Sequence, residues 1–234
     1  MSQVVASRPL TFLLYVTTHL SDYHKACLSG PAWSGAGAAY PENHLRHPAL
    51  AFSHHHFFVP SAGVAWVREH FPNATASSPR AGAGAGKQAG AIEAMTDLAS
   101  RQLFRSVDWV VRLNPDVFVL DFSPFYAQIS YRYEAIVGTC SGGRVLTDFT
   151  VFRAAALDRD AVAMRCPPGI GRLPNAECEM TRALRNATLA GLVKVVYRTR
   201  STCRMTWKGV VMHVHAAHAA HAAHNASLRF GQRS

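Results

Sequence analysis

Asn114, Pro115 and Asp116 interrupt an apolar run, VDWVVRLNPDVFVLD, that covers residues 107–121. If residues 107–113 form a buried strand, these three residues lie where the backbone leaves the sheet. Asn, Pro and Asp are all common turn formers, so one interpretation is a simple Pro-Asp turn. The other interpretation is chemical: oxygen ligands at a strand end bind Mn²⁺ or Mg²⁺, and the cation bridges the oxygens of a diphosphate. Such a cation stabilises the negative charge that builds on a leaving phosphate.

Two histidines near the C-terminus are candidate partners for that metal. The segment GVVMHVH (209–215) is typical of a strand, in which residues two apart point to the same face. His213 and His215 would therefore share a face, although a histidine in a strand is more often a structural residue than a ligand. The Ala-rich repeat AAHAAHAAH (216–224) is interpreted as low-complexity sequence that binds metals adventitiously.

Three acidic residues are candidates for a general base that deprotonates an acceptor hydroxyl. Asp148 lies in an apolar strand segment, where a carboxylate is costly unless it is paired or functional. A salt bridge with Arg144 or Arg153 is the structural alternative. Glu177 and Glu179 lie at the start of a predicted helix, where the helix dipole favours acidic residues and a capping role is the alternative.

Strands and helices that alternate along the chain must position these residues. Apolar and β-branched runs predict strands at residues 10–18, 49–59, 107–113, 117–120, 135–139, 147–152, 192–198 and 209–215. Helices are predicted at residues 61–71, 87–104, 154–164 and 175–190. This alternation predicts one α/β domain with a mixed, mostly parallel central sheet flanked by helices. Ligands of such folds collect at the carboxyl ends of the strands, and residues 114–116 follow one such end.

The Gly- and Ala-rich segment ASSPRAGAGAG (76–86) is predicted to be a flexible loop before the second of these helices. It does not match a phosphate-binding P-loop, because Ala81 and Gln88 stand where Gly and Ser or Thr are required. The GxGxxG fingerprint also fails at its last glycine. The helix start near Lys87 and Gln88 still offers free N–H groups to a phosphate.

The composition indicates a folded protein with a basic surface. The 234 residues are 49% hydrophobic and 16% charged, which excludes a disordered chain. The 24 Lys and Arg against 14 Asp and Glu give a net charge of +10, which attracts phosphates, polyanions or anionic membranes. The arginines are scattered singly, so no dedicated nucleic-acid-binding arm is visible and no nucleic-acid partner is predicted.

The cysteines and asparagines bear on the compartment. The five cysteines have no C-x-x-C spacing, so they do not indicate a zinc ribbon, and one or two disulfides are compatible with them. Three of the six asparagines, Asn73, Asn186 and Asn225, lie in N-x-S/T sequons, which weakly favours the Golgi or another secretory lumen over the cytoplasm. No apolar run reaches the roughly 18 residues of a transmembrane segment, so none is predicted in this chain.

The order of these features resembles the GT-A glycosyltransferases of the nucleotide-diphospho-sugar transferase superfamily. The features are the first strand ending in Thr17-Thr18, the loop and helix GKQAGAIEAM, the strand DWVVRLNPD, the strand TDFTVFR, the acidic NAECEMTRAL and the terminal HVH. The resemblance implies a transferase domain over residues 1–215, followed by a low-complexity tail over residues 216–234. It also implies transfer of a sugar from a nucleotide diphosphate, most simply a UDP-sugar, to a hydroxyl of a glycan, protein or small molecule.

The resemblance assigns a role to each candidate residue. Residues near the nucleotide sugar would be Thr17, Thr18, Lys87, Gln88, Arg112 and Asn114. The Mn²⁺ or Mg²⁺ ligands would be Asp116, His213 and His215, and Asp148 and Glu177 would be the catalytic carboxylates. The sequence departs from the family's Asp-x-Asp motif at Asn114, whose amide brings no charge to a metal.

Three alternatives stay open at the level of sequence. The chain is compatible with a basic module that binds polyanions or nucleic acid, whose binding would weaken steeply with salt. It is compatible with a catalytically inactive binding protein of the same fold. A histidine-rich metal-binding protein is the third alternative, and it depends on His54, His55, His56 and the tail.

Overall fold

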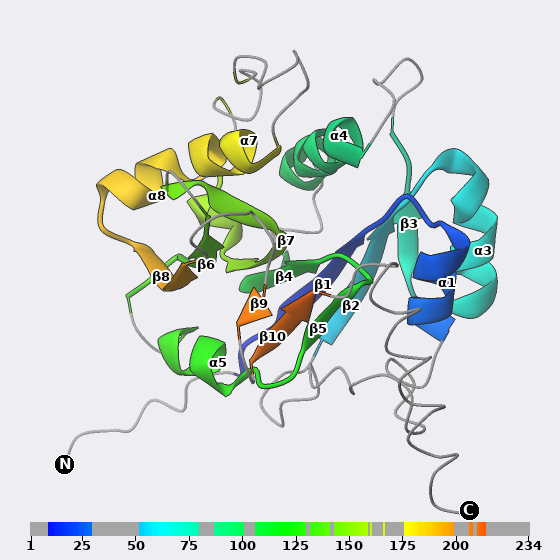
Figure 1. Ribbon diagram of the computed structural model, residues 1–234, viewed down its shortest axis with the longest axis horizontal. Helices are drawn as coiled ribbons and strands as arrows, with labels where there is room; N and C mark the ends of the chain where they lie inside the picture. The colour runs from blue at the N-terminus through cyan, green and yellow to red at the C-terminus, as the bar shows by residue number, and fades with distance from the viewer. Residues whose placement is uncertain are drawn as a thin grey trace, which may run out of the picture.

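A computed structural model describes the fold over most of the chain. The described residues are 9–29, 52–79, 87–100, 106–129, 132–140, 143–158, 160, 166, 176–198, 206–207 and 210–213. They form a large and a small β-sheet, with helices on both faces of the large one (Figure 1). This is the single α/β domain that the alternation of strands and helices predicts.

The large sheet has seven strands in the order β3-β2-β1-β4-β7-β6-β8. The pairs on either side of β1 are parallel, as are β2 with β3 and β6 with β8, whereas β7 runs antiparallel to both β4 and β6. The sheet is therefore mixed and mostly parallel, as predicted. Its strands are β1 (Phe12–Thr17), β2 (Phe52–Phe58), β3 (Thr75–Ser77), β4 (Trp109–Leu113), β6 (Ala135–Thr139), β7 (Val145–Phe152) and β8 (Val193–Arg198).

The small sheet has three antiparallel strands in the order β5-β10-β9. These are β5 (Val117–Val119), β9 (Thr206–Trp207) and β10 (Val211–His213). Only residues 114–116 separate β4 of the large sheet from β5 of the small one. The Asn-Pro-Asp segment is therefore the connection between the two sheets.

Two hydrophobic cores cover the two faces of the large sheet, because side chains alternate along each strand. On β1, Phe12, Leu14 and Val16 enter one core, whereas Leu13 and Tyr15 enter the other. The first core includes the small sheet and α1 (Asp22–Ser29), α3 (Val64–His70) and α5 (Ser123–Ile129). The second includes α4 (Lys87–Ser100), α7 (Ala176–Ala183) and α8 (Arg185–Leu189), which lie together above the sheet in Figure 1.

Two of the predicted helices differ from the observed elements. The helix predicted over residues 175–190 is divided at Leu184 into α7 and α8. The helix predicted over 154–164 begins as the 3₁₀ turn η4 (Ala154–Ala156) and is interrupted at residues 157–158, and residues 159 and 161–165 lie outside the described part. A second 3₁₀ turn, η1 (Ser61–Gly63), leads directly into α3.

Part of the predicted loop over residues 76–86 is also ordered as a strand. Ala76 and Ser77 belong to β3, which pairs with β2, and residues 80–86 lie outside the described part. The low-complexity tail over residues 216–234 lies outside it as well.

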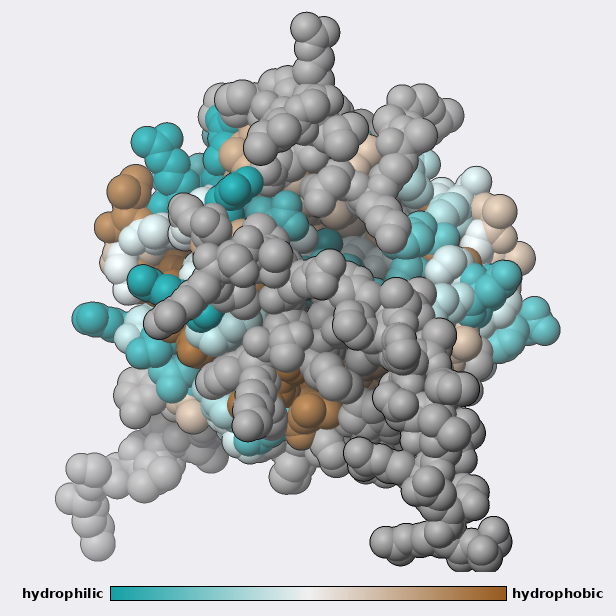
Figure 2. Space-filling view, viewed as in Figure 1, coloured by the Kyte–Doolittle hydropathy of each residue, from teal (hydrophilic) through white to brown (hydrophobic). Residues whose placement is uncertain are grey.

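The described surface in Figure 2 is mainly hydrophilic to neutral over α3, α7 and α8. Leu189 of α8, 74% exposed, is the large hydrophobic side chain that stands out on it. None of the helices that the structure describes is both long and apolar enough to cross a membrane.

Candidate functional site

The carboxyl ends of β1 and β4 meet β7 at one edge of the large sheet. Val16 of β1 is the register partner of Leu113 of β4. One residue further on, the Asn114 amide nitrogen donates to the Asp148 carbonyl oxygen of β7 at 2.9 Å. Ligands of open α/β sheets collect at edges of this kind, so this edge is the candidate functional site.

Four predicted site residues form one hydrogen-bonded chain at this edge. Arg112 Nη2 donates to Thr17 Oγ1 at 3.2 Å, and Thr17 Oγ1 donates in turn to Asn114 Oδ1 at 2.7 Å. Asn114 Nδ2 then donates to Asp148 Oδ1 at 2.9 Å. Residues from β1, β4 and β7 that are far apart in the sequence are therefore held in one fixed arrangement.

An amide at position 114 is suited to its two neighbours. The Asn114 side chain accepts a hydrogen bond from a hydroxyl through its oxygen and donates one to a carboxylate through its nitrogen. An ionised Asp at this position would have no proton to donate and would place a second negative charge beside Asp148. The departure from an Asp-x-Asp pattern thus has a structural reason in this fold.

Arg112 is a buried cation beside the acidic residues of the site. Its side chain is 1% exposed, and its Nε and Nη1 atoms have no hydrogen-bond partner in the described part of the chain. Burial lowers the pKa of the Arg112 guanidinium, whereas the nearby Asp148, then Tyr15 and Glu177, raise it. Asp148 and Glu177 therefore both lie within electrostatic reach of the same positive charge.

Asp116 lies in the turn that joins the two sheets, and it is 9% exposed. The turn is closed by a hydrogen bond from the Val117 amide to the Asn114 carbonyl oxygen at 3.1 Å. The Asp116 carboxylate Oδ2 lies 3.7 Å from Nε2 of His24 on α1. Residues 114–116 therefore form a turn, as one interpretation of the sequence predicts. The other interpretation, metal binding, would use the same Asp116 carboxylate.

The register of the small sheet places one predicted metal ligand near this turn. His213 is the Cα partner of Val117, the residue that follows Asp116. The His213 side chain and all of His215 lie outside the described part. Among the described residues, no three His, Cys, Asp or Glu side chains lie together as a metal site. Asp116 is thus one carboxylate ligand of the kind Mn²⁺ or Mg²⁺ takes, and alone it does not complete a metal shell.

Thr18 shapes the loop that follows β1. Its Oγ1 accepts a hydrogen bond from the Leu20 amide at 2.8 Å. Leu20 has a φ of 50°, a left-handed conformation that is costly for a branched side chain. The Leu20 side chain is buried against Gly63, where an added Cβ would lie 2.6 Å from Leu20 Cδ2. The loop at the end of β1 is therefore fixed in one strained conformation.

The remaining predicted residues are on α4 and α7. Lys87 and Gln88 are the first two residues of α4, as predicted, and their side chains lie outside the described part. Glu177 is half-buried in the first turn of α7. Glu179 is 4% exposed and accepts a hydrogen bond from the Cys166 amide, beside the Cys166–Cys178 disulfide, so it has a structural role in holding that segment.

Sequence reasoning did not find His24 and Tyr197. His24, 5% exposed, is oriented by Ser21, whose Oγ lies 3.1 Å from His24 Nδ1. Tyr197 of β8 lies near Asp148, and burial first, then that carboxylate, raise the pKa of its hydroxyl. The ring occupies the space over Gly138 of β6, where an added Cβ would overlap it. The Ser-x-x-His spacing at the start of α1 was the available signal for His24, whereas Tyr197 is brought in only by strand pairing.

The histidine cluster on β2 is mainly structural. His56 is fully buried, and its two ring nitrogens lie 2.7 Å from Thr75 Oγ1 and 2.8 Å from Ser77 Oγ. Its ring is stacked on Tyr15. His54 and His55 are exposed on the same strand. Nothing in the described residues therefore supports the interpretation of this cluster as a metal site.

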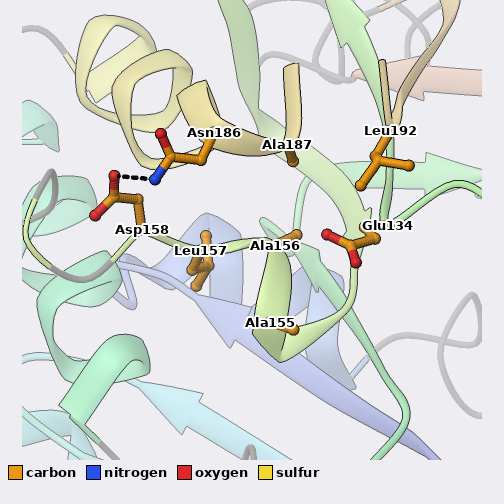
Figure 3. Close-up of a pocket in the computed structure, with 8 residues that line it drawn as sticks. All are labelled: Glu134, Ala155, Ala156, Leu157, Asp158, Asn186, Ala187 and Leu192. Carbon is orange, nitrogen blue, oxygen red and sulfur yellow. Dashed lines mark hydrogen bonds between the residues drawn. The ribbon is translucent and has the colours of Figure 1, made fainter. Parts of the chain in front are cut away.

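A separate pocket of about 300 Å³ lies at the opposite edge of the large sheet (Figure 3). It is bounded by Glu134 before β6, Leu192 before β8, and Asp158 after β7. Figure 3 shows the Glu134 carboxylate on one side and the Asp158–Asn186 pair on the other, joined by a hydrogen bond of 2.8 Å. None of the predicted site residues lines this pocket.

Comparisons with known proteins bear on the fold. No protein-family model matches the chain, and no curated protein matches it. Among solved structures, the chain is similar to a 4-diphosphocytidyl-2C-methyl-D-erythritol synthase from Anaerococcus prevotii DSM 20548, with a TM-score of 0.50 and 10% identity. The similarity covers 94% of this chain and 96% of that one. At this identity the likeness shows the fold alone, and it agrees with the α/β fold predicted from the sequence.

A second solved structure has a weaker likeness. It is a protein from Desulfovibrio desulfuricans G20 named a "putative nucleotide-diphospho-sugar transferase", with a TM-score of 0.45 and 12% identity. The similarity covers 82% of this chain and 81% of that one.

Proposed function

We propose that the chain is a glycosyltransferase that moves a sugar from a nucleotide diphosphate, a UDP-sugar in the simplest case, to a hydroxyl acceptor. The observation that carries the proposal is the chain of hydrogen bonds from Arg112 through Thr17 and Asn114 to Asp148. It lies at the carboxyl ends of β1 and β4, where α/β folds bind nucleotides, and Asp116 follows in the next turn.

The donor occupies the side of the site formed by β1 and β4. Thr17, Thr18, Lys87, Gln88 and Asn114 would contact the nucleotide, and Asp116, His213 and His215 would hold Mn²⁺ or Mg²⁺. When bound, such a cation offsets the charge of the diphosphate leaving group. The register pairing of His213 with Val117, next to Asp116, supports this ligand set.

The acceptor proton goes to a carboxylate of the site. Asp148 is held through Oδ1 by Asn114, so we assign it to orienting the reacting groups. Glu177 is half-buried at the start of α7 and lies within electrostatic reach of Arg112, so we assign it as the general base. Arg112 supplies one buried positive charge, which offsets part of the negative charge of the two carboxylates.

Product analysis tests this proposal against nucleotidyl transfer, the other reaction class that the fold allows. The protein is incubated with Mn²⁺ and a panel of UDP-sugars, and separately with nucleoside triphosphates. Glycosyl transfer or hydrolysis releases UDP from a UDP-sugar, whereas nucleotidyl transfer releases pyrophosphate from a triphosphate. UDP release is the expected result. Pyrophosphate release without UDP release would assign the site to nucleotidyl transfer. The absence of both products would indicate an inactive binding protein.

We also propose that the protein works in the Golgi or another oxidising secretory compartment. The Cys166–Cys178 disulfide and a further disulfide at Cys140 support this location, because such bonds persist where thiols are not kept reduced. The sequon at Asn73 lies in an exposed turn after α3. Endoglycosidase treatment of the protein made in eukaryotic cells should lower its apparent mass, and an unchanged mass would count against this location.

A further inference from the structure

The edge that carries the proposed site continues beyond Asp148 onto β6 and β8. Thr139, at the carboxyl end of β6, pairs with Val145 of β7 on one side and with Arg198 of β8 on the other. Because adjacent strands lie about 4.8 Å apart, the backbones at residues 145 and 198 are roughly 10 Å apart. Arg144 immediately precedes Val145, so Arg144 and Arg198 flank the same point of the edge.

Both arginines are available to a ligand. Arg144 and Arg198 are exposed, and neither takes part in an ion pair with another residue that the structure describes. Arg144 is in the turn between β6 and β7, which is closed by a hydrogen bond from the Cys140 amide to the Arg144 carbonyl oxygen at 2.8 Å. Val145, which Arg144 precedes and which Arg198 faces across Thr139, is three residues before Asp148 on β7. The pair therefore borders the proposed reaction centre.

The two arginines lie on the side of Asp148 away from the donor residues. Across the edge the strands follow the order β1, β4, β7, β6, β8, with Thr17 on β1 and Arg198 on β8. Four strand spacings separate these two, or roughly 19 Å. A diphosphate held at β1 and β4 is therefore not the anion that this pair meets.

The charge distribution of the sequence agrees with an anionic partner on this side. Residues 180–234 contain nine Lys and Arg but no Asp or Glu. Four of these basic residues, including Arg198, fall within residues 198–208, the stretch that runs from the end of β8 to the end of β9 and one residue beyond. The structure describes four of the nine, Arg182 on α7, Arg185 on α8, and Lys194 and Arg198 on β8, so the described stretch from Arg182 to Arg198 carries positive charge and no acidic residue.

From these observations we infer that the acceptor is an anionic glycan, whose carboxylate or sulfate groups are bound by Arg144 and Arg198. A guanidinium forms two parallel hydrogen bonds to either group, which fixes orientation as well as charge. A glycan supplies the hydroxyl that the proposed transfer requires, together with separated anionic groups along one chain. The inference rests on the proposed function for the acceptor role, but the binding itself is measurable without turnover.

The test is the affinity of the full chain for three oligosaccharides at about 0.15 M ionic strength, where long-range attraction is screened. They are hyaluronan with carboxylates only, chondroitin sulfate with carboxylates and sulfates, and neutral dextran. Poly-glutamate is measured beside them as an anionic chain that is not a glycan. Binding to one or both anionic glycans and not to dextran is expected, and the difference between them identifies the anionic group. Equal binding of dextran would overturn the inference, as would tighter binding of poly-glutamate than of either glycan.

Matched variants locate the binding. Arg144→Ser with Arg198→Ser should weaken affinity for the anionic glycan about tenfold, the product of two exposed contacts of roughly threefold each. The control, Arg68→Ser with Arg132→Ser, removes the same charge from exposed arginines on α3 and before β6, at the opposite edge. The control should change affinity less than twofold. An equal loss in both double variants, or no loss in the first, would overturn the assignment.

The donor assay on the unmodified protein separates the two proposals. If glycan binding depends on Arg144 and Arg198 but no UDP-sugar is turned over, the proposed function fails and the anionic site stands. If a UDP-sugar is turned over but the glycan does not bind, the proposed function stands and this inference fails.

Discussion

Asn114 is the residue on which the arrangement of the site depends most directly. Its side chain connects the Thr17 hydroxyl on β1 to the Asp148 carboxylate on β7. Its backbone N–H donates to the Asp148 carbonyl oxygen. The sequence placed Thr17, Arg112, Asn114 and Asp148 in one site, and the structure brings these four together. The sequence alone did not show why position 114 is Asn, because the reason is a hydrogen bond to a residue 34 positions away.

Replacing Asn114 by Asp should destabilise the fold, although it restores an Asp-x-Asp sequence. The variant loses a donor and sets two carboxylates side by side, at a cost of about 1–3 kcal/mol in the free energy of unfolding. The cost should shrink as the pH falls to about 4, because one carboxyl then takes up a proton. Urea unfolding at pH 7 and pH 4 measures both effects. Equal stability of variant and parent at pH 7 would contradict the hydrogen bonding described here.

Cys27 should make the stability of the protein depend on alkaline pH. Burial in α1 raises the pKa of its thiol from 9.0 to about 11, with a hydrogen bond from Tyr23 opposing the shift and Asp116 adding to it. The folded state therefore keeps a proton that the unfolded chain loses above pH 9. The free energy of unfolding should fall between pH 9 and pH 11 by on the order of 2 kcal/mol.

The comparison for this prediction is Cys27→Ala, measured over the same pH range. Cys27 is the free cysteine among those described, so the substitution leaves the Cys166–Cys178 disulfide in place. The variant should lose less stability than the parent between pH 9 and pH 11. Parallel pH curves for the two proteins would show that Cys27 does not titrate with the shifted pKa.

At the scale of elements, the buried strands were the most predictable part. Apolar runs predicted β1, β4 and β6, because a strand covered on both faces must be apolar nearly throughout. Runs rich in apolar and β-branched residues also predicted β2, β7 and β8, although polar residues interrupt them. The helix α1 was not predicted, since DYHKACLS has few apolar residues and no helical stripe. The antiparallel direction of β7 and the division of α7 from α8 were also missed, because tertiary packing and not local sequence decides them.

Gly138 tests the pairing of β6 with β8. An added Cβ at this position would overlap the Tyr197 ring, so Gly138→Ala should lower the free energy of unfolding by about 1–3 kcal/mol through overpacking. Gly90→Ala is the control, since Gly90 lies in α4 with open space around it. That substitution should raise stability by roughly 0.5–1 kcal/mol, because alanine is the better helix former. Chemical denaturation of both variants measures the two changes in the free energy of unfolding. A Gly138→Ala protein as stable as the parent would contradict the close packing of Tyr197 on Gly138.

For the whole molecule, the two sheets explain where the chemistry is placed. The large sheet holds Thr17, Arg112 and Asp148 rigidly, while the short connection to the small sheet presents Asp116 next to the strand that carries His213. Along the same edge the strand order separates the proposed donor side at β1 and β4 from the basic side at β6 and β8. The closeness of Arg144 to Arg198 could not be predicted from the sequence, because it depends on the pairing of β6 with both β7 and β8.

The central claim is that the edge formed by β1 and β4 binds and activates a nucleotide diphosphate sugar. It is tested most directly by UDP release from a panel of UDP-sugars with Mn²⁺ present, for the parent, for Asp116→Ala and for the exposed control Asp160→Ala. The parent and the control should release UDP at similar rates. Asp116→Ala should lower kcat/KM by about 100-fold or more, since a bound cation contributes several kcal/mol. Equal UDP release by Asp116→Ala and the parent would contradict the claim.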